Sequence, residues 1–263
     1  MLRAGAPDDV LVRAAAANQR TWLARQAEAA GGTVHREPGL TWTLGGGAGA
    51  IAFPALTRAR ADTALAEVVA AARAARAREV SCWSLLPTRP RDLGERLLGL
   101  GFELGWQAHW MALDLDDAGP PAEAAGVEVA VVEPGEPWAA EGLPYDDPGA
   151  AERRRVLAAA TPRRVWHLAA RRDGTPVGHA TLSVSTGRIG VAGLYDVGVR
   201  ADQRRRGIGR ALTALACSLA RVQGYRHATL NATYEGEQLY AALGFRSVGV
   251  AQTWWLHLPR GPR

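Results

Sequence analysis

The chain has 263 residues, 48% hydrophobic and 22% charged, which is typical of a folded globular protein and excludes a wholly disordered one. Its two cysteines, Cys82 and Cys217, are too few for a disulfide framework, and we interpret both as reduced core thiols. The most apolar stretch, residues 64–77, contains two arginines and is shorter than the roughly 20 residues of a bilayer span. We therefore expect a cytoplasmic protein without a membrane partner.

The net charge of +5 comes entirely from the later part of the chain, because the first 118 residues hold equal numbers of arginines and acidic residues. One short stretch holds five arginines: Arg200, Arg204, Arg205, Arg206 and Arg210. Nucleic-acid-binding proteins usually spread basic residues along a face and add aromatic residues or a reading helix. One focal cluster beside glycines instead favours a compact polyanion, so we expect no nucleic-acid partner.

The first part of the chain alternates between helix and strand patterns. Helices are predicted over residues 8–30, 61–77 and 92–100, and strands over 33–36, 39–44, 50–56, 79–85 and 110–115. Residues 116–126 are rich in Pro, Gly and Ala and have no apolar period, which is typical of a linker. We place the linker at 118–126, between a first domain of residues 1–117 and a second of residues 127–263.

The second part predicts a similar mixture of elements. Strands are expected over residues 127–133, 165–172, 177–185, 191–199, 227–231, 245–250 and 254–258, and helices over 151–160, from the arginine cluster to about 223, and over 235–243. The tripeptide Leu-Gly-Phe occurs at 100–102 and at 243–245, at the same point of each half, which indicates an internal repeat. The fold class is therefore α+β, a mixed sheet flanked by helices in each half.

One motif carries chemistry. Residues 204–209 read Arg-Arg-Arg-Gly-Ile-Gly and lie between a predicted strand and an amphipathic helix. The first turn of a helix has unpaired N–H groups and the positive end of the helix dipole. Glycines let a phosphate approach the backbone, and arginines add charge-assisted hydrogen bonds. The spacing predicts a phosphate-binding loop.

From residue 165 to the C-terminus the chain resembles the GNAT superfamily of acyl-CoA-dependent N-acyltransferases. The resemblance rests on Val199-x-x-x-x-Arg204-x-x-Gly207-x-Gly209, on Asn231 at a strand end, and on Tyr240-x-x-Leu243-Gly244-Phe245. It implies a tandem arrangement of two GNAT-like domains, in which the first half is a degenerate copy without the Arg-x-x-Gly-x-Gly loop.

The resemblance also assigns site residues. It implies that the backbone of Val197, Gly198 and Val199 pairs with the pantetheine arm of acetyl-CoA, and that the N–H groups of Arg205, Arg206, Gly207, Ile208, Gly209 and Arg210 hold its pyrophosphate. Arg204, Arg206 and Arg210 would add salt bridges, and Asn231 would bond the cofactor. Tyr240 would contact the cofactor and act as the general acid that protonates the leaving thiolate.

The general base is left open by the sequence. Many GNAT relatives carry a glutamate at the place of Gly193, and they often carry Pro and Gly at the places of Ala201 and Arg205. Asp196, on the same strand as Gly193, is the nearest carboxylate and our candidate, and a chain of water molecules is the alternative. Tyr145, Asp146 and Asp147 lie in a segment that borders the acceptor site in this superfamily, or form an ordinary solvated loop.

The implied function is an N-acetyltransferase that transfers an acetyl group from acetyl-CoA to a primary amine of a small molecule or peptide, by direct attack in a ternary complex. The alternative is a catalytically silent acyl-CoA sensor. The six histidines show no metal-binding spacing, so we expect no metal. The sequence leaves the oligomeric state, monomer or homodimer, open.

Overall fold

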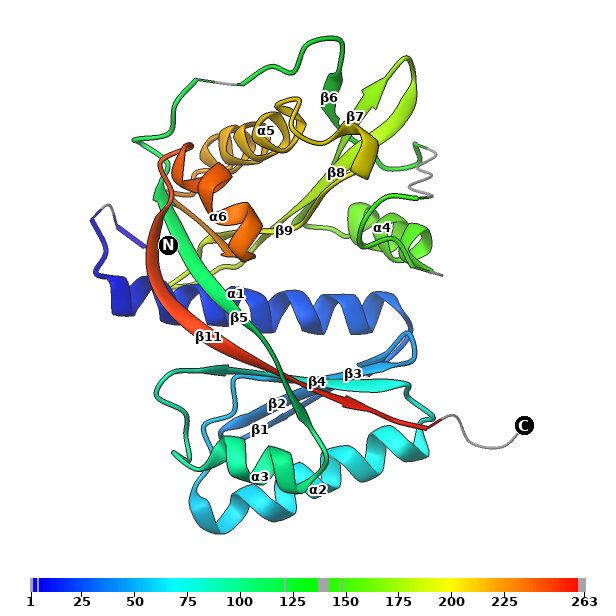
Figure 1. Cartoon of the computed structure of the whole chain (residues 1–263), viewed down its shortest axis with the longest axis vertical. Coiled ribbons are helices and arrows are strands. Elements are labelled where there is room, and N and C mark those ends of the chain that lie inside the picture. The colour runs from blue at the N-terminus through cyan, green and yellow to red at the C-terminus, as the bar shows by residue number, and fades with distance from the viewer. Residues whose placement is uncertain (1, 4, 121, 137–141, 148, 260–263) are drawn as a thin grey trace. The chain divides into compact units, whose positions relative to one another are not determined.

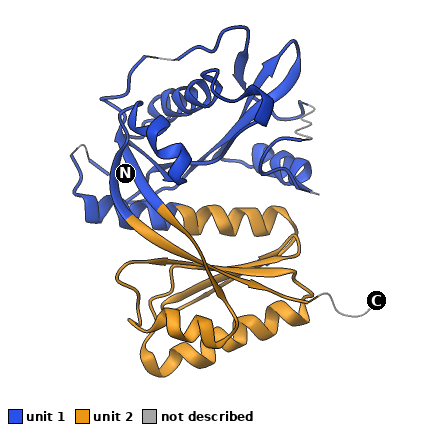
Figure 2. Cartoon of the chain, viewed as in Figure 1, with its two compact units in different colours: residues 1–18, 109–249 blue, residues 19–108, 250–263 orange. Residues whose placement is uncertain are grey.

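A computed structural model describes residues 2–3, 5–120, 122–136, 142–147 and 149–259 (Figure 1). Contacts divide the chain into two compact units (Figure 2). Unit 1 comprises residues 1–18 and 109–249, and unit 2 comprises residues 19–108 and 250–263. This division differs from the expected linear one at 118–126, because the first helix and two long strands each contribute residues to both units.

Unit 2 is built on a mixed sheet. Its strands lie in the order β1 (Thr33–Glu37), β2 (Leu40–Gly45), β3 (Ala48–Ala52), β4 (Glu79–Leu85) and the later part of β11 (Arg246–His257). Only β3 and β4 are parallel. The helices α2 (Arg58–Ala74) and α3 (Leu93–Gly99) bury Leu65, Val68 and Leu97 in a core that includes Ile51 and Cys82.

The other strands of the mixed sheet belong to unit 1. Its strands lie in the order β5 (Glu103–Asp114), β10 (His227–Ala232), β9 (Ala192–Val199), β8 (Thr175–Val184), β7 (Val165–Arg172) and β6 (Glu128–Val131). Here only β9 and β10 are parallel. The helices are α4 (Ala150–Ala159), α5 (Ile208–Val222), α6 (Tyr234–Ala241) and the part of α1 (Asp8–Ala29) up to Asn18. The predicted class, mixed sheets flanked by helices, is confirmed.

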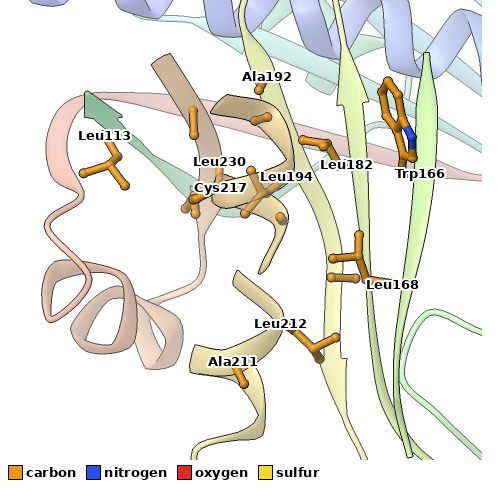
Figure 3. Close-up of a cluster of buried hydrophobic side chains, with 14 of the residues drawn as sticks. Leu113, Trp166, Leu168, Leu182, Ala192, Leu194, Ala211, Leu212, Cys217 and Leu230 are labelled. Carbon is orange, nitrogen blue, oxygen red and sulfur yellow. The ribbon is translucent and has the colours of Figure 1, made fainter. Parts of the chain in front are cut away.

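The two faces of the unit 1 sheet differ in polarity. On one face Trp166, Leu182 and Leu194 stand opposite one another on β7, β8 and β9, and with Leu212 of α5 they belong to one buried hydrophobic cluster (Figure 3). Because successive strand residues point to opposite sides, the other face carries His167, Thr181 and Tyr195 in one row. That second, buried polar face is the one that α4 and the first part of α1 contact.

The long strands β5 and β11 correct two predictions. Residues 245–250 and 254–258 were expected as separate strands, but β11 is one continuous strand. Thr253 lies within it, and its side-chain hydroxyl donates a hydrogen bond to the carbonyl of Trp106 at 2.7 Å. Because this polar side chain has a partner, it does not interrupt the strand. β5 begins at Glu103, well before the expected residue 110.

Each of these two strands begins in one unit and ends in the other. Residues 109–114 of β5 pair with β10 in unit 1, and residues 251–257 of β11 pair with β4 in unit 2. Each strand follows a Leu-Gly-Phe tripeptide that ends a short helix, with Gly101 at φ 88° and Gly244 at φ 92°. The repeat seen in the sequence is therefore also a repeat of structure.

Both cysteines are buried free thiols, as expected. None of the described helices combines the length and the apolar character that a bilayer span requires.

Candidate functional site

The strands β9 and β10 separate within unit 1. Their parallel pairing covers Ala192–Leu194 against Ala228–Leu230 and no later residue of β9. Beyond this point Asp196 has φ 52°, and the register with β8 shifts between His179 and Thr181, which makes a bulge in β9. The β10 side of residues 195–199 therefore carries no strand pairing among the described residues, and an extended ligand can be added there.

The loop after β9 has the form of an anion-binding turn. A short 3₁₀ turn, Ala201–Gln203, leads to Arg205 at φ 62° and Gly207 at φ 80°, immediately before α5. Two left-handed residues at a helix start direct main-chain N–H groups into a concave surface. The glycine that relatives often have at the place of Arg205 is explained by this φ, which glycine adopts without strain.

The space in front of this loop is open. A Cβ atom on Gly207 would meet no atom closer than 3.9 Å, and no side chain among the described residues caps α5. The side chains of Arg205, Arg206 and Arg210 are exposed and make no hydrogen bond or ion pair within the part of the chain that the structure describes. Arg200, in contrast, pairs with Asp202 at 2.7 Å. The loop thus fits a pyrophosphate, with three arginines available to neutralise it.

Tyr240 lies on α6, a helix whose N-terminus is capped by the Thr233 hydroxyl, which accepts a hydrogen bond from the N–H of Gly236 at 3.2 Å. Its ring packs edge-on against Phe245, with 5.9 Å between the centroids. Burial, and then the neighbouring phenol of Tyr145, raise the pKa of Tyr240 above its ordinary value. The hydroxyl therefore stays protonated at neutral pH and can act as a proton donor.

Asp196 is half-buried in the bulge of β9. Burial raises the pKa of its carboxyl to about 6, against the opposing effect of Arg154 and Arg153, while Asp147 adds to the rise. The pKa of Tyr145 is also raised, first by burial and then by the charge of Asp196. Tyr145 therefore lies within electrostatic range of both Asp196 and Tyr240.

The acidic residues beside Tyr145 are ion-paired. Asp146 accepts a hydrogen bond from Arg154 at 3.1 Å, and Asp147 accepts one from Arg153 at 2.6 Å. These pairs largely neutralise the acidic charge of the segment that was expected either to border the acceptor site or to form a solvated loop.

The place of a glutamate at Gly193 is filled by two other residues. A Cβ on Gly193 would lie 2.2 Å from Asn18 Oδ1 and 2.8 Å from the hydroxyl oxygen of Tyr195. Tyr195 donates a hydrogen bond to Asn18 Oδ1 at 2.6 Å, and Asn18 Nδ2 donates to Val191 and Ser183 carbonyls at 2.9 and 3.0 Å. Asn18 is not among the residues that the sequence predicted for the site, because its only signal is its place on the buried side of the first helix.

Asn231 lies at the point where the two strands part. It is one residue beyond Leu230, the last residue of β10 that pairs with β9, and it stands opposite Trp110 of β5. This position agrees with a contact to a ligand that enters between the strands.

Residues 131–245 match the sequence profile of the Acetyltransferase (GNAT) family. This part of the chain is a GNAT domain. The resemblance inferred from the sequence is thereby confirmed, and the family supports acyl transfer in general.

Solved structures show the same fold. A GCN5-related N-acetyltransferase from Kribbella flavida is 22% identical, with a TM-score of 0.64 over 92% of this chain and 95% of that one. A tandem GNAT protein from the clavulanic acid biosynthesis pathway is 19% identical, with a TM-score of 0.53 over 85% and 79%. A GCN5-related N-acetyltransferase from Sphaerobacter thermophilus is 16% identical, with a TM-score of 0.52 over 96% and 95%. A search of curated protein sequences gave no match.

Unit 2 has a GNAT-like outline but differs from unit 1 at the strand opening and at the position that corresponds to Tyr240. Its parallel strands β3 and β4 stay paired from Ala48 to Ala52, and the N–H of Phe53 continues the pairing at 2.7 Å from the carbonyl of Trp83. In α3 the buried Leu97 accepts a hydrogen bond from the N–H of Phe102, as Tyr240 does from Phe245. Unit 2 thus has neither the strand opening nor the phenol.

The raised pKa of Asp196 gives a testable pH dependence. If the Asp196 carboxylate is the general base, kcat/KM rises with pH through about 6, because only the deprotonated form accepts a proton. We expect Asp196→Asn to lower the plateau and to abolish this limb of the profile. The check is a kcat/KM profile at saturating acetyl-CoA, and an unchanged limb in Asp196→Asn would assign it to another group.

Proposed function

We propose that the protein is an N-acetyltransferase that transfers an acetyl group from acetyl-CoA to a primary amine. The observation that carries the proposal is the open edge of β9 beside an uncapped, arginine-rich helix start. The open edge of β9 suits the extended pantetheine arm, and the start of α5 suits the pyrophosphate. Both belong to one continuous segment of the chain.

Acetyl-CoA is proposed to bind along the end of β9 and the loop that follows it. The main chain of Val197–Val199 pairs with the pantetheine arm as an added strand would. The N–H groups from Arg205 to Arg210 hold the pyrophosphate, and the side chains of Arg204, Arg206 and Arg210 surround it. Asn231 bonds the cofactor at the strand opening. No metal ion is part of the proposal, and the described residues contain no group of three His, Cys, Asp or Glu side chains that could hold one.

The chemistry is a direct transfer within a ternary complex. The amine nitrogen bonds to the acetyl carbonyl carbon, the carbon–sulfur bond breaks, and the amine proton passes to Asp196 or to water. Tyr240 donates its proton to the departing thiolate sulfur. Holding both reactants in place supplies much of the acceleration, because the reaction then behaves as a unimolecular one.

The acceptor is proposed to be the amine of a small molecule or a peptide. The arginine pairs of Asp146 and Asp147 leave the wall beside Tyr145 close to neutral. Attraction of a cation by these acids therefore contributes little to the choice of acceptor.

The test is release of CoA thiol from acetyl-CoA in the presence of a panel of primary amines. Amine-dependent release supports the proposal. Binding of acetyl-CoA without release on any amine would favour the silent sensor, which the absence of a glutamate at Gly193 also favours. No binding of acetyl-CoA would contradict both functions.

The contrast between the units predicts the binding stoichiometry. Because β3 and β4 remain paired in unit 2, we expect one equivalent of acetyl-CoA per chain in isothermal titration calorimetry. Arg206→Ala should weaken this single event, whereas Arg58→Ala, at the start of α2 in unit 2, should leave it unchanged. A second equivalent would contradict the assignment of unit 2 as a degenerate copy.

A further inference from the structure

Asn18 of α1 is a buried amide whose hydrogen bonds all go to the β8–β9 part of unit 1, and only 1% of the residue is exposed. Its Nδ2 donates to the carbonyls of Val191 at 2.9 Å and Ser183 at 3.0 Å, and it lies 3.1 Å from the Ser185 hydroxyl. Because carbonyl oxygens only accept, these contacts fix which end of the amide is the nitrogen. Oδ1 is therefore the end that meets Tyr195.

Tyr195 completes this arrangement from β9. Its hydroxyl donates to Asn18 Oδ1 at 2.6 Å, at the short end of the range for such bonds. Its ring lies close to Gly193, where an added Cβ would be 2.7 Å from ring atom Cε2 and 2.8 Å from the hydroxyl oxygen. Gly193 thus leaves the space in which the ring of Tyr195 reaches Asn18.

Tyr195 is also the last regularly paired residue before the bulge in β9. It stands opposite Thr181 of β8, whereas the next pair joins Gly198 to His179, so β9 carries one extra residue directly after Tyr195. Moving the bulge to the other side of Tyr195 would turn this side chain to the opposite face of the sheet. The hydrogen bond to Asn18 can therefore form only while the bulge follows Tyr195.

We propose that Asn18 and Tyr195 are a positioning pair that fixes the bulge of β9 and, with it, the open strand edge that receives acetyl-CoA. The inference rests on the proposed function, because residues 197–199 of that edge are the part assigned to the pantetheine arm. In this role neither side chain contacts the reactants, and both act through the main chain of β9. The small size of Gly193 is then a requirement of the pair.

The first experiment examines the free protein by NMR. Tyr195→Phe keeps the ring beside Gly193 and removes only the hydroxyl. We expect the ¹³Cα and amide signals of residues 196–198 to shift or to double, because the bulge is no longer held at one position. Unchanged signals in the folded variant would overturn the proposal.

Thr229→Val is the matched control. Thr229 is 2% exposed, and its hydroxyl donates to the carbonyl of Ala192 at 3.3 Å, in the part of β9 before the bulge. Both variants lose one buried hydroxyl, so we expect Tm to fall in both. The signals of residues 196–198 should change in Tyr195→Phe alone, and equal changes in the two variants would contradict a specific role for the pair.

The second experiment compares two ligands. Acetyl-CoA has a pyrophosphate and a pantetheine arm, whereas ADP has the pyrophosphate alone. Tyr195→Phe should weaken acetyl-CoA binding about tenfold, as expected for the loss of one well-formed hydrogen bond, and leave the Kd of ADP within about twofold. Thr229→Val should leave both affinities unchanged. An equal loss for ADP in Tyr195→Phe would indicate general damage to the loop and overturn the proposal.

Gly193→Ala disturbs the pair from the opposite side. Its Cβ would press on both Asn18 Oδ1 and the Tyr195 ring, so it separates the two groups while both remain present. It should reproduce the effect of Tyr195→Phe on acetyl-CoA binding. Wild-type protein that binds no acetyl-CoA would contradict the proposed function itself. Wild-type binding together with unchanged affinity in both variants would overturn the positioning role alone.

Discussion

Replacing Tyr240 by phenylalanine should lower kcat by about 10²- to 10⁴-fold, the usual contribution of a general acid, and leave the Kd for acetyl-CoA within about twofold. Phenylalanine keeps the ring that packs against Phe245 and removes only the hydroxyl. The raised pKa of Tyr240 means that the wild-type hydroxyl still carries its proton when the thiolate departs. Steady-state kinetics and calorimetric titration with acetyl-CoA measure the two quantities.

The same helix supplies a matched control. Tyr234 is the first residue of α6 and is 87% exposed. Tyr234→Phe removes an identical hydroxyl from the same helix and should leave both kcat and Kd unchanged. Equal activity of Tyr240→Phe and wild type would remove Tyr240 from the mechanism, and a parallel loss of cofactor binding would assign it a binding role instead.

Local pattern was enough to predict most elements of unit 1. Ile208, Leu212, Leu215 and Leu219 recur at helical spacing; in α5 the first two are buried, and the other two are partly buried against the same core. Residues 173–174 join β7 and β8, two strands that the sequence predicted, and their antiparallel pairing runs from Val165 to Arg172. These elements are specified by neighbours in the chain, which a single sequence displays.

Pairing between distant segments was not predictable in the same way. The two strands β5 and β11 have similar lengths and follow the same tripeptide, so nothing local assigns β10 or β4 to either of them. The prediction of two separate strands at 245–258 failed because Gln252 and Thr253 interrupt the apolar run. Their partners, Ser84 and Trp83, come from unit 2, far earlier in the chain.

The candidate site also has one part that a local pattern predicts and another that depends on distant segments of the chain. The Arg-x-x-Gly-x-Gly spacing indicated the loop before α5 because all its parts are consecutive. The occupation of the space beside Gly193 depends on Asn18, which is brought there only by the packing of α1 on the sheet.

Gly207→Val should abolish measurable acetyl-CoA binding, a loss of at least about 100-fold in Kd. Valine at φ 80° strains the loop, and its branched side chain adds bulk to the open space beside Gly207. The pyrophosphate needs that space, because N–H groups bind an anion only at hydrogen-bond distance. Calorimetric titration and the rise in Tm on adding acetyl-CoA both measure the loss.

Backbone strain alone has to be separated from loss of the binding surface. Gly187, in the turn between β8 and β9 at the opposite end of β9, has φ 89° and no atom within 4 Å of an added Cβ. Gly187→Val therefore introduces the same kind of strain, about 1–3 kcal/mol, without touching the loop. Both variants should lose comparable stability, and only Gly207→Val should lose the Tm rise with acetyl-CoA. Normal acetyl-CoA binding by folded Gly207→Val would place the pyrophosphate elsewhere and remove the basis for acetyl transfer at this loop.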